Sequence, residues 1–298
     1  MKILKIAGAP ISWGVCEVPG WGYQLTPQRV LAEMRDVGLA ATELGPEGFL
    51  PSDPDELTAL LDSYSLSCVG TFAPVLLHDA GHDPLPDIAG PLDALVACGA
   101  DVLVLAAATG TDGYDSRPTL DDGQWATLLG NLDRLAAAAA QRGVLAVLHP
   151  HVGTMVETRS DVDRVLAGSQ IKLCLDTGHL LIGGTDPLQL ARAVPGRIAH
   201  AHLKDVDAAL AAQVQAGELT YTEAVRKGMY TPLGGGDVDI AGIVMALRGN
   251  GFDGWFVMEQ DTIVDGEPTD EGPVRDVRTS VAYVRSICQS AVPPPIPA

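Results

Sequence analysis

The sequence contains few basic residues and no long hydrophobic stretch. Its 298 residues include 19 lysines and arginines against 38 aspartates and glutamates, so the formal net charge is −19 at pH 7. A surface this acidic repels phosphate backbones and anionic lipid head groups, so we expect neither nucleic acid nor a membrane surface as a partner. The longest apolar stretches, such as 102–108, are far shorter than the ~20 residues of a membrane-spanning helix.

Cysteine is also scarce and shows no paired spacing. The five cysteines are odd in number, and none belongs to a CxxC motif. This usage is typical of a reducing compartment, and the amino-terminal segment lacks an apolar core of signal-peptide length. We therefore predict a cytoplasmic protein. Hydrophobic residues make up 47% of the chain and charged ones 19%, which excludes disorder and allows a large core without disulfides.

Short apolar runs alternate with longer amphipathic segments along most of the chain. The apolar runs predict strands, and their nearly continuous hydrophobicity is typical of a parallel sheet covered on both faces. Eight strand and helix pairs within this length favour an α/β fold, a single (β/α)8 TIM barrel, over an open sheet. The predicted strands are 4–9, 40–44, 66–72, 101–107, 144–149, 171–176, 197–203 and 254–259. The predicted helices are 27–37, 53–64, 86–98, 121–142, 159–167, 186–193, 238–249 and 272–289.

Two segments fall outside this alternation within a predicted barrel domain of residues 1–290. Residues 206–236 follow the seventh predicted strand as an irregular insertion. In a barrel this insertion lies at the active-site end, so we expect it to form either a lid or a subunit contact in a homo-oligomer. Residues 291–298 are rich in proline and are predicted to form a flexible or extended tail.

Histidines and carboxylates gather at the ends of the last four predicted strands. His149 ends the fifth strand, and Asp176 ends the sixth. His202 lies near the end of the seventh strand, and Glu259 ends the eighth. In a barrel these ends open onto one mouth, so the four side chains are expected to meet there. Two imidazoles and two carboxylates form a mixed nitrogen and oxygen site that suits Mn²⁺, Co²⁺, Fe²⁺ or Zn²⁺ better than Ca²⁺.

Each of these motifs also has a purely structural explanation. DTGH at 176–179 is typical of an aspartate that caps a helix, and HPH at 149–151 is typical of a polar strand end. Four consecutive strands that all end in ligand-type residues are difficult to obtain by chance. A divalent metal site is therefore the favoured prediction.

Further residues are expected near the same mouth. Trp13 follows the first strand and is either a hydrophobic wall for a sugar ring or a core residue. Glu43 is expected to hydrogen-bond a substrate hydroxyl or to pair with a basic residue, and Phe72 ends the third predicted strand. Lys204 is expected to need a kink at the strand end to point inward, and a lowered pKa to act as a base. The PLGGGD loop at 232–237 lacks the spacing of a nucleotide-binding loop.

At these motifs the chain resembles the xylose-isomerase-like TIM-barrel superfamily over nearly its whole length. Within that superfamily it is most similar to the inosose dehydratases. The similarity is carried by AGAPISWG, TELG, LHPHVGT, CLDTGH, HAHLKDVD, PLGGGDVD and WFVMEQD. The resemblance implies that Asp176, His202 and Glu259 bind the metal, while His149 stands where sugar isomerases and epimerases have a glutamate. That glutamate is one of two carboxylates that pass a proton in ketose epimerases, so the histidine argues against epimerase chemistry.

The resemblance implies a lyase that removes water from a keto-polyol such as 2-keto-myo-inositol, with Mn²⁺ or Co²⁺ preferred over Zn²⁺ or Fe²⁺. Such a reaction needs a base that removes the α-proton and an acid that protonates the leaving β-hydroxyl. The candidates for these two roles, in order of preference and without an assignment, are His179, Lys204, His151 and Glu157. The predicted substrate-binding residues are Trp13, Glu43, Phe72, His179 and Asp261. The alternatives are a metal-dependent isomerase or epimerase of a ketose or keto acid, a keto-glycoside lyase, and a barrel that binds without catalysis.

Overall fold

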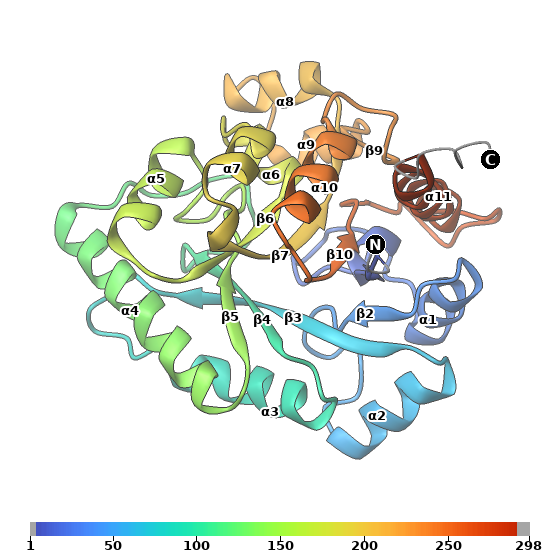
Figure 1. Cartoon of the computed structure of the whole chain (residues 1–298), viewed down its shortest axis with the longest axis horizontal. Coiled ribbons are helices and arrows are strands. Elements are labelled where there is room, and N and C mark those ends of the chain that lie inside the picture. Colours follow the sequence, from blue (N-terminus) through green and yellow to red (C-terminus); the bar gives the residue numbers. More distant parts are fainter. Residues whose placement is uncertain (1–3, 291–298) are drawn as a thin grey trace, which may run out of the picture.

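Eight parallel strands close into one barrel in the computed structural model, which describes residues 4–290, with side chains up to residue 287 (Figure 1). Around the barrel the strands follow the order β1, β10, β7, β6, β5, β4, β3 and β2. The predicted (β/α)8 barrel is therefore confirmed. The barrel strands are β1 (Ile6–Gly8), β2 (Ala41–Glu43), β3 (Ser67–Leu76), β4 (Val102–Ala108), β5 (Leu145–Leu148), β6 (Lys172–Asp176), β7 (Ile198–Leu203) and β10 (Phe256–Met258).

Helices surround the barrel, and several begin at the capping residues that the sequence supplies. Asp53 and Thr158, for example, accept hydrogen bonds from backbone N–H groups of the first turn that would otherwise lack partners. None of the described helices is long and apolar enough to cross a membrane. The outer helices are α1 (Pro27–Asp36), α2 (Pro54–Ser63), α3 (Ala89–Ala97), α4 (Asp122–Gln141), α5 (Arg159–Gly168), α7 (Pro187–Ala193), α10 (Ile240–Gly249) and α11 (Val274–Ser290).

Helix α6 and the structure of the insertion are absent from the predicted elements, although the DTGH motif had indicated a helix cap at Asp176. Helix α6 (Thr177–Ile182) begins directly after β6, because Oδ1 of Asp176 accepts hydrogen bonds from the first-turn N–H groups at 2.9 and 2.8 Å. The insertion is more regular than expected. It contains α8 (Ala208–Gln215) and α9 (Tyr221–Arg226), and a pair of short antiparallel strands, β8 (Asp205–Val206) and β9 (Tyr230–Thr231), encloses them.

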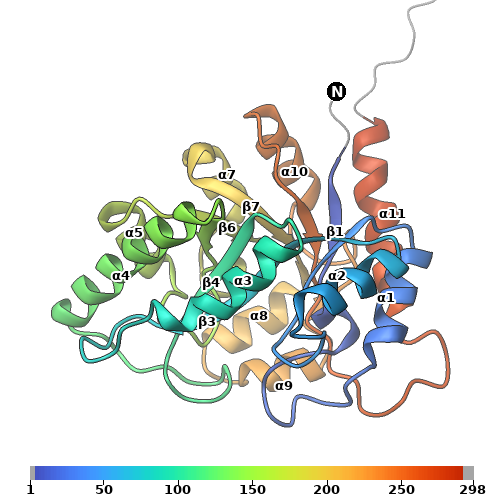
Figure 2. The same cartoon turned by 90° about the horizontal axis from the view of Figure 1, so that it is seen from below.

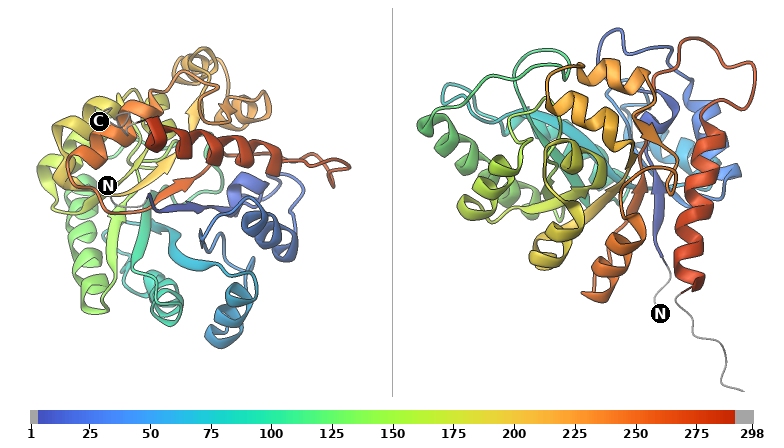
Figure 3. Two further views of the ribbon diagram at one scale, coloured as in Figure 1. Left: turned by 45° about the vertical axis from the view of Figure 1, so that its right-hand side comes forward. Right: turned by 90° about the horizontal axis from the view of Figure 1, so that it is seen from above.

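The insertion lies at the end of the barrel toward which the strands run. Figure 2 shows α8 and α9 at the bottom of the view, whereas β1 starts at the top. The right-hand panel of Figure 3 shows the same arrangement from above, with the light-orange helices α8 and α9 at the end opposite the amino terminus. The insertion therefore stands beside the carboxyl ends of the strands. The predicted tail, 291–298, lies outside the described residues.

Asp205 ties the PLGGGD loop to the base of the insertion. Its fully buried carboxylate accepts hydrogen bonds from the backbone N–H groups of Gly234, Gly236 and Val238 at 2.8, 3.1 and 3.0 Å. A β-carbon at Gly236 would lie 2.4 Å from Oδ1 of Asp205, so the loop has no room for a side chain there. Glycine at this position thus lets the loop backbone come close enough to hydrogen-bond the carboxylate of Asp205.

The two faces of each strand carry different residues. Leu103 and Leu105 of β4 belong to the large cluster that also contains helix residues such as Leu128, so these side chains face outward. Val104 and Cys174 belong to a separate small cluster and face the barrel interior. The interior is thus filled mainly by alanine, valine and cysteine, and leucines pack the strands against the helices.

Candidate active site

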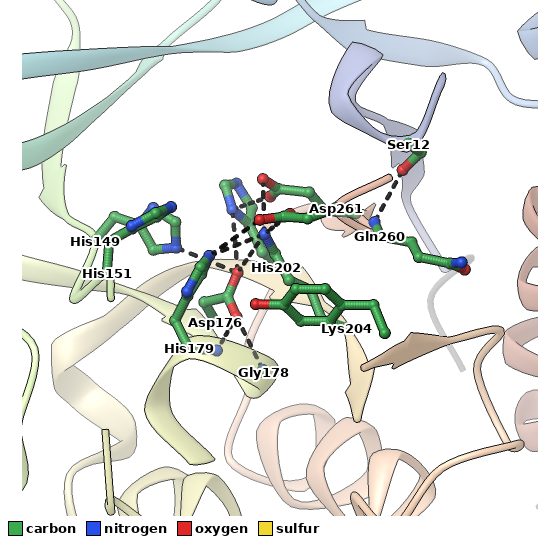
Figure 4. A network of polar contacts seen from close by, with 12 residues as sticks. Ser12, His149, His151, Asp176, Gly178, His179, His202, Lys204, Gln260 and Asp261 are labelled. Carbon is green, nitrogen blue, oxygen red and sulfur yellow. Dashed lines mark hydrogen bonds and ion pairs between the residues drawn. The ribbon is translucent and has the colours of Figure 1, made fainter. Parts of the chain in front are cut away.

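Alternation along the strands places the four predicted metal ligands on the interior side at one end of the barrel. Cys174 of β6 faces inward, and Asp176, two residues later, faces the same way at the strand end. Val257 of β10 likewise faces inward, and Glu259 follows at the mouth. Figure 4 shows His149, Asp176 and His202 converging from their separate strands.

Three of these residues have atoms close enough to share one ion, and His149 adjoins them. Nε2 of His149 lies 3.2 Å from Oδ2 of Asp176, and Nδ1 of His202 lies 3.7 Å from the same oxygen. Oε2 of Glu259 contacts Nδ1 of His202. Potential ligand atoms of Asp176, His202 and Glu259 lie within 4.8 Å of one another. The sequence therefore selected four side chains that the fold brings together.

Five buried atoms of these four residues have no hydrogen-bond partner among the described residues. They are Nδ1 and Nε2 of His149, Oδ2 of Asp176, Nδ1 of His202 and Oε2 of Glu259. Four of the five face one another as the close contacts described above, yet none of the five makes a hydrogen bond, and buried polar atoms without a hydrogen bond need an explanation. Imidazole nitrogens and carboxylate oxygens are ligands of divalent first-row metals, and the donor set fits such an ion.

The charge of the site also fits a cation. Glu43, Asp176, Glu259 and Asp261 bring four carboxylates into the site, with side-chain exposures of 11% or less. Lys204 is the ammonium that contacts three of them. One ammonium against four carboxylates leaves an excess of negative charge. Burial alone would lower the pKa of His202, but this excess raises the pKa well above its usual range. A divalent cation would offset this excess in such a poorly solvated place.

Lys204 points into the site, and period-two alternation from His202 is enough to place it there, contrary to our expectation. It lies two residues beyond His202, so both share the inward face of the chain. Its Nζ lies 3.1 Å from Oε1 of Glu259 and contacts Oδ1 of Asp261. Burial would lower the pKa of Lys204, but these carboxylates raise the pKa well above its usual range. Lys204 is therefore an ammonium, which donates hydrogen bonds and has no lone pair with which to accept a proton.

Glu43 holds two histidines. Its Oε1 accepts hydrogen bonds from Nε2 of His200 at 2.8 Å and from Nε2 of His202 at 2.9 Å. Burial alone would raise the pKa of Glu43, but His202 and His200 lower it to about 2. Glu43 is thus an ionised carboxylate that orients the imidazole of His202.

His151 and His179 stack beside the four predicted ligands. Their ring centroids are 3.7 Å apart. Nδ1 of His151 donates to the carbonyl oxygen of Val152 at 2.6 Å, so its Nε2 carries the lone pair. Nε2 of His179 lies 3.1 Å from Nζ of Lys204. Burial lowers the pKa of both histidines well below the usual range, so both rings are neutral.

Two candidates from the sequence do not reach this group. Trp13 is completely buried in the large hydrophobic cluster, and its Nε1 donates to Glu33 at 2.7 Å. Of our two alternatives for Trp13, the core position is the observed one. Glu157 accepts a hydrogen bond from the backbone of Gly153 at 2.8 Å and pairs with Arg117 at 3.3 Å, so it supports the HPHVGT loop.

Several residues of the site were missed from the sequence. A cavity opens above the predicted ligands, and the predicted residue Phe72 lines it. Three residues on irregular segments that the sequence did not indicate also line it, namely Glu17, Trp21 and Tyr114. Tyr114 stacks on His151 with a centroid distance of 4.3 Å, and its hydroxyl donates to Glu17. Strand-end reasoning cannot find residues on loops, because their direction depends on packing between distant segments.

An inward cluster of imidazoles, carboxylates and an ammonium at the carboxyl ends of barrel strands defines an enzyme of the TIM-barrel type. The chain belongs to the xylose isomerase-like TIM-barrel family, whose model matches residues 31–287. An inosose dehydratase from Geobacillus kaustophilus is 32% identical to this chain over 86% of its length and 87% of the relative's own. The rhizopine catabolism protein MocC of Rhizobium meliloti is 34% identical, over 87% of this chain and 82% of the relative.

A solved structure confirms the likeness of the fold. The IOLI protein with a bound zinc atom superposes with a TM-score of 0.72 at 16% sequence identity. The match covers 97% of this chain and 99% of that protein. At this identity the comparison supports the architecture, and the chemistry has to be argued from this chain's own residues.

Proposed function

We propose that this enzyme is a metal-dependent dehydratase that removes water from a keto-polyol such as 2-keto-myo-inositol. The observation that carries the proposal is the convergence of five buried atoms that make no hydrogen bond, from His149, Asp176, His202 and Glu259. It is supported by the 32% identity to an inosose dehydratase over most of the chain. A mixed site of this kind next to an ammonium and neutral imidazoles has the groups that a dehydration needs.

The metal would be held by the four residues with unpaired atoms. When bound, it supplies a positive charge that polarises a ketone oxygen and makes the neighbouring C–H group acidic. Two carboxylates and two imidazoles suit Mn²⁺, Co²⁺, Zn²⁺ and Fe²⁺. Among these we propose Mn²⁺ or Co²⁺ first, because of the resemblance to the inosose dehydratases. Zinc should be tested beside these metals, since the IOLI protein, which has the same fold, binds a zinc atom.

His151 is the proposed proton acceptor. It lines the cavity, and its Nδ1 hydrogen bond to Val152 leaves the lone pair on Nε2. We therefore infer that Nε2 of His151 is the atom that removes an α-proton from a bound ketone. Phe72 and Tyr114 pack against its ring with centroid distances of 6.0 and 4.3 Å, which fixes the direction of the imidazole.

Lys204 is the proposed proton donor. Its ammonium is fully buried and is held by Asp261 and Glu259. As the C–O bond breaks, the leaving hydroxyl takes a proton from Nζ and departs as water, and the electron pair of the C–H bond forms the new double bond. His179 lies 3.1 Å from Nζ, so it is placed to hold the ammonium and an adjacent substrate hydroxyl.

The direct test is an assay with the Mn²⁺ or Co²⁺ protein and 2-keto-myo-inositol, with the chelator-treated protein as a blank. Dione formation is followed by ultraviolet absorbance, and α-proton exchange in D₂O by NMR. Metal-dependent dione formation is the expected result. Exchange without loss of water would instead assign an isomerase or epimerase, and a lack of both signals would reject this substrate.

Metal binding is tested separately by elemental analysis of variants. Asp176→Asn and Glu259→Gln should lose stoichiometric metal, because each replaces a charged ligand by a weak neutral one. Glu267→Gln, at an exposed carboxylate, is the matched control and should retain it. Full metal content in Asp176→Asn would refute the assigned site.

A further inference from the structure

Tyr221 belongs to the insertion, yet its hydroxyl lies within the polar network of the site. It is the first residue of α9 and is 1% exposed. The hydroxyl donates to Oδ2 of Asp261, and it lies 3.0 Å from the hydroxyl of Tyr230 on β9. The insertion thus sends a buried hydrogen-bond donor toward the proposed catalytic groups.

Asp261 connects Tyr221 with Lys204. Its Oδ2 accepts from Tyr221, and its Oδ1 contacts Nζ of Lys204. Asp261 lies three residues beyond the end of β10, in a segment without regular structure. Its carboxylate therefore depends on side-chain hydrogen bonds for its orientation, and Tyr221 provides the neutral donor among them.

Tyr221 does not line the cavity above the predicted ligands, whereas Asp261 does. A change of its hydroxyl therefore acts through Asp261 and not through direct contact with a substrate. The carboxylate of Asp261 in turn contacts the ammonium whose Nζ lies 3.1 Å from Nε2 of His179. A shift of this carboxylate would displace the ammonium from the proposed leaving hydroxyl.

We propose that Tyr221 is a positioning residue that fixes Asp261 and thereby holds the ammonium of Lys204 in place for proton donation. The insertion is then a constituent of the active site and not only a cover over it. The proposal rests on the proposed function in one respect, namely the role of Lys204 as proton donor.

Tyr221→Phe is a suitable variant because it removes the hydroxyl and keeps the ring. That ring packs against Trp21, Tyr114 and His179 with centroid distances of 6.4, 6.3 and 5.8 Å, so the hydrophobic contacts remain. Tyr64→Phe, at the end of α2, makes the same chemical change outside the site. Comparison of the two variants shows whether an effect belongs to the hydroxyl of Tyr221 in the site or to any exchange of tyrosine for phenylalanine.

The first experiment measures kcat and KM of the metal-reconstituted full-length enzyme. Tyr221→Phe should lower kcat by about 10–100-fold, the usual effect of one buried hydrogen bond, and leave KM within about threefold. Metal content should not change, and Tyr64→Phe should behave like the unmodified protein. An unchanged kcat, or a rise of KM alone, would overturn the proposal.

A double-mutant cycle tests the connection through Asp261. If Tyr221 acts by orienting Asp261, Tyr221→Phe should lower kcat by less than about twofold further in an Asp261→Asn protein. Independent, multiplicative losses would show that Tyr221 has a separate structural effect, and they would overturn the proposal.

A spectroscopic measurement keeps the proposal testable if 2-keto-myo-inositol is not the substrate. The ¹⁵N resonance of the buried Lys204 ammonium is assigned by its disappearance in Lys204→Met. Tyr221→Phe should shift or broaden this resonance, and Tyr64→Phe should not. Inactive unmodified protein with a shifted resonance would reject the proposed substrate alone, whereas an unshifted resonance would reject the role of Tyr221.

Discussion

Glu43 binds His202 through Nε2 at 2.9 Å and so turns Nδ1 of that histidine toward Asp176 and Glu259. A neutral imidazole has one N–H group and one lone pair, so a donated Nε2–H leaves the lone pair on Nδ1. Glu43 and Asp176 come from strands far apart around the barrel, and His202 links them. The carboxylate of Glu43 thus determines which nitrogen faces the proposed metal.

Glu43→Gln should weaken metal binding by about 10–100-fold, because a neutral amide orients His202 less firmly than a carboxylate does. Competition with a chelator of known affinity measures this change. Activity should return when metal is added in excess, since the four ligands remain. Glu267→Gln is the control, and equal affinity of the Glu43 variant and the unmodified protein would contradict the orienting role.

His149→Glu should keep the metal and slow dehydration by at least about tenfold. The substitution adds a negative charge next to Asp176 and Glu259, which weakens the pull of the metal on the ketone oxygen. Elemental analysis and the dione assay together measure both effects. If the variant dehydrates at the full rate, the histidine at this position does not separate dehydratases from epimerases.

Glu17→Gln should raise KM by about 3–10-fold with little change in kcat. Glu17 and Tyr114 line the cavity from two different loops, and their hydrogen bond joins these loops above the site. The loss of one charge-assisted hydrogen bond weakens this wall without touching the proposed metal ligands. Steady-state kinetics provide the measurement, and a fall in kcat at constant KM would speak for a role in the chemical step instead.

Gly236→Ala should destabilise the protein by about 1–3 kcal/mol. The new methyl group would lie 2.4 Å from Oδ1 of Asp205 and 2.7 Å from the backbone nitrogen of Val206. Urea unfolding measures the loss of free energy of unfolding. Gly266→Ala is the matched control, because its β-carbon would meet no atom within 4 Å. Equal stability of both variants would show that Asp205 can move aside.

The sequence alone determined the barrel and the four predicted ligands. The strand pattern is local, since side chains alternate with period two, and the end of each apolar run marks the mouth of the barrel. His149, Asp176, His202 and Glu259 therefore follow from strand ends without knowledge of any contact. The helix starts at Asp53 and Asp121 were equally readable, because capping depends on residues within one turn.

Only the tertiary structure decided which partners these residues have. Glu43 meets His202 across 159 positions of the chain, and Tyr221 meets Asp261 across 40, so no local pattern records either contact. The three carboxylate neighbours of Lys204 likewise come from segments distant in the sequence. The periodicity of a strand fixes the face on which a side chain lies, whereas closure of the barrel and the fold of the insertion fix what that side chain meets.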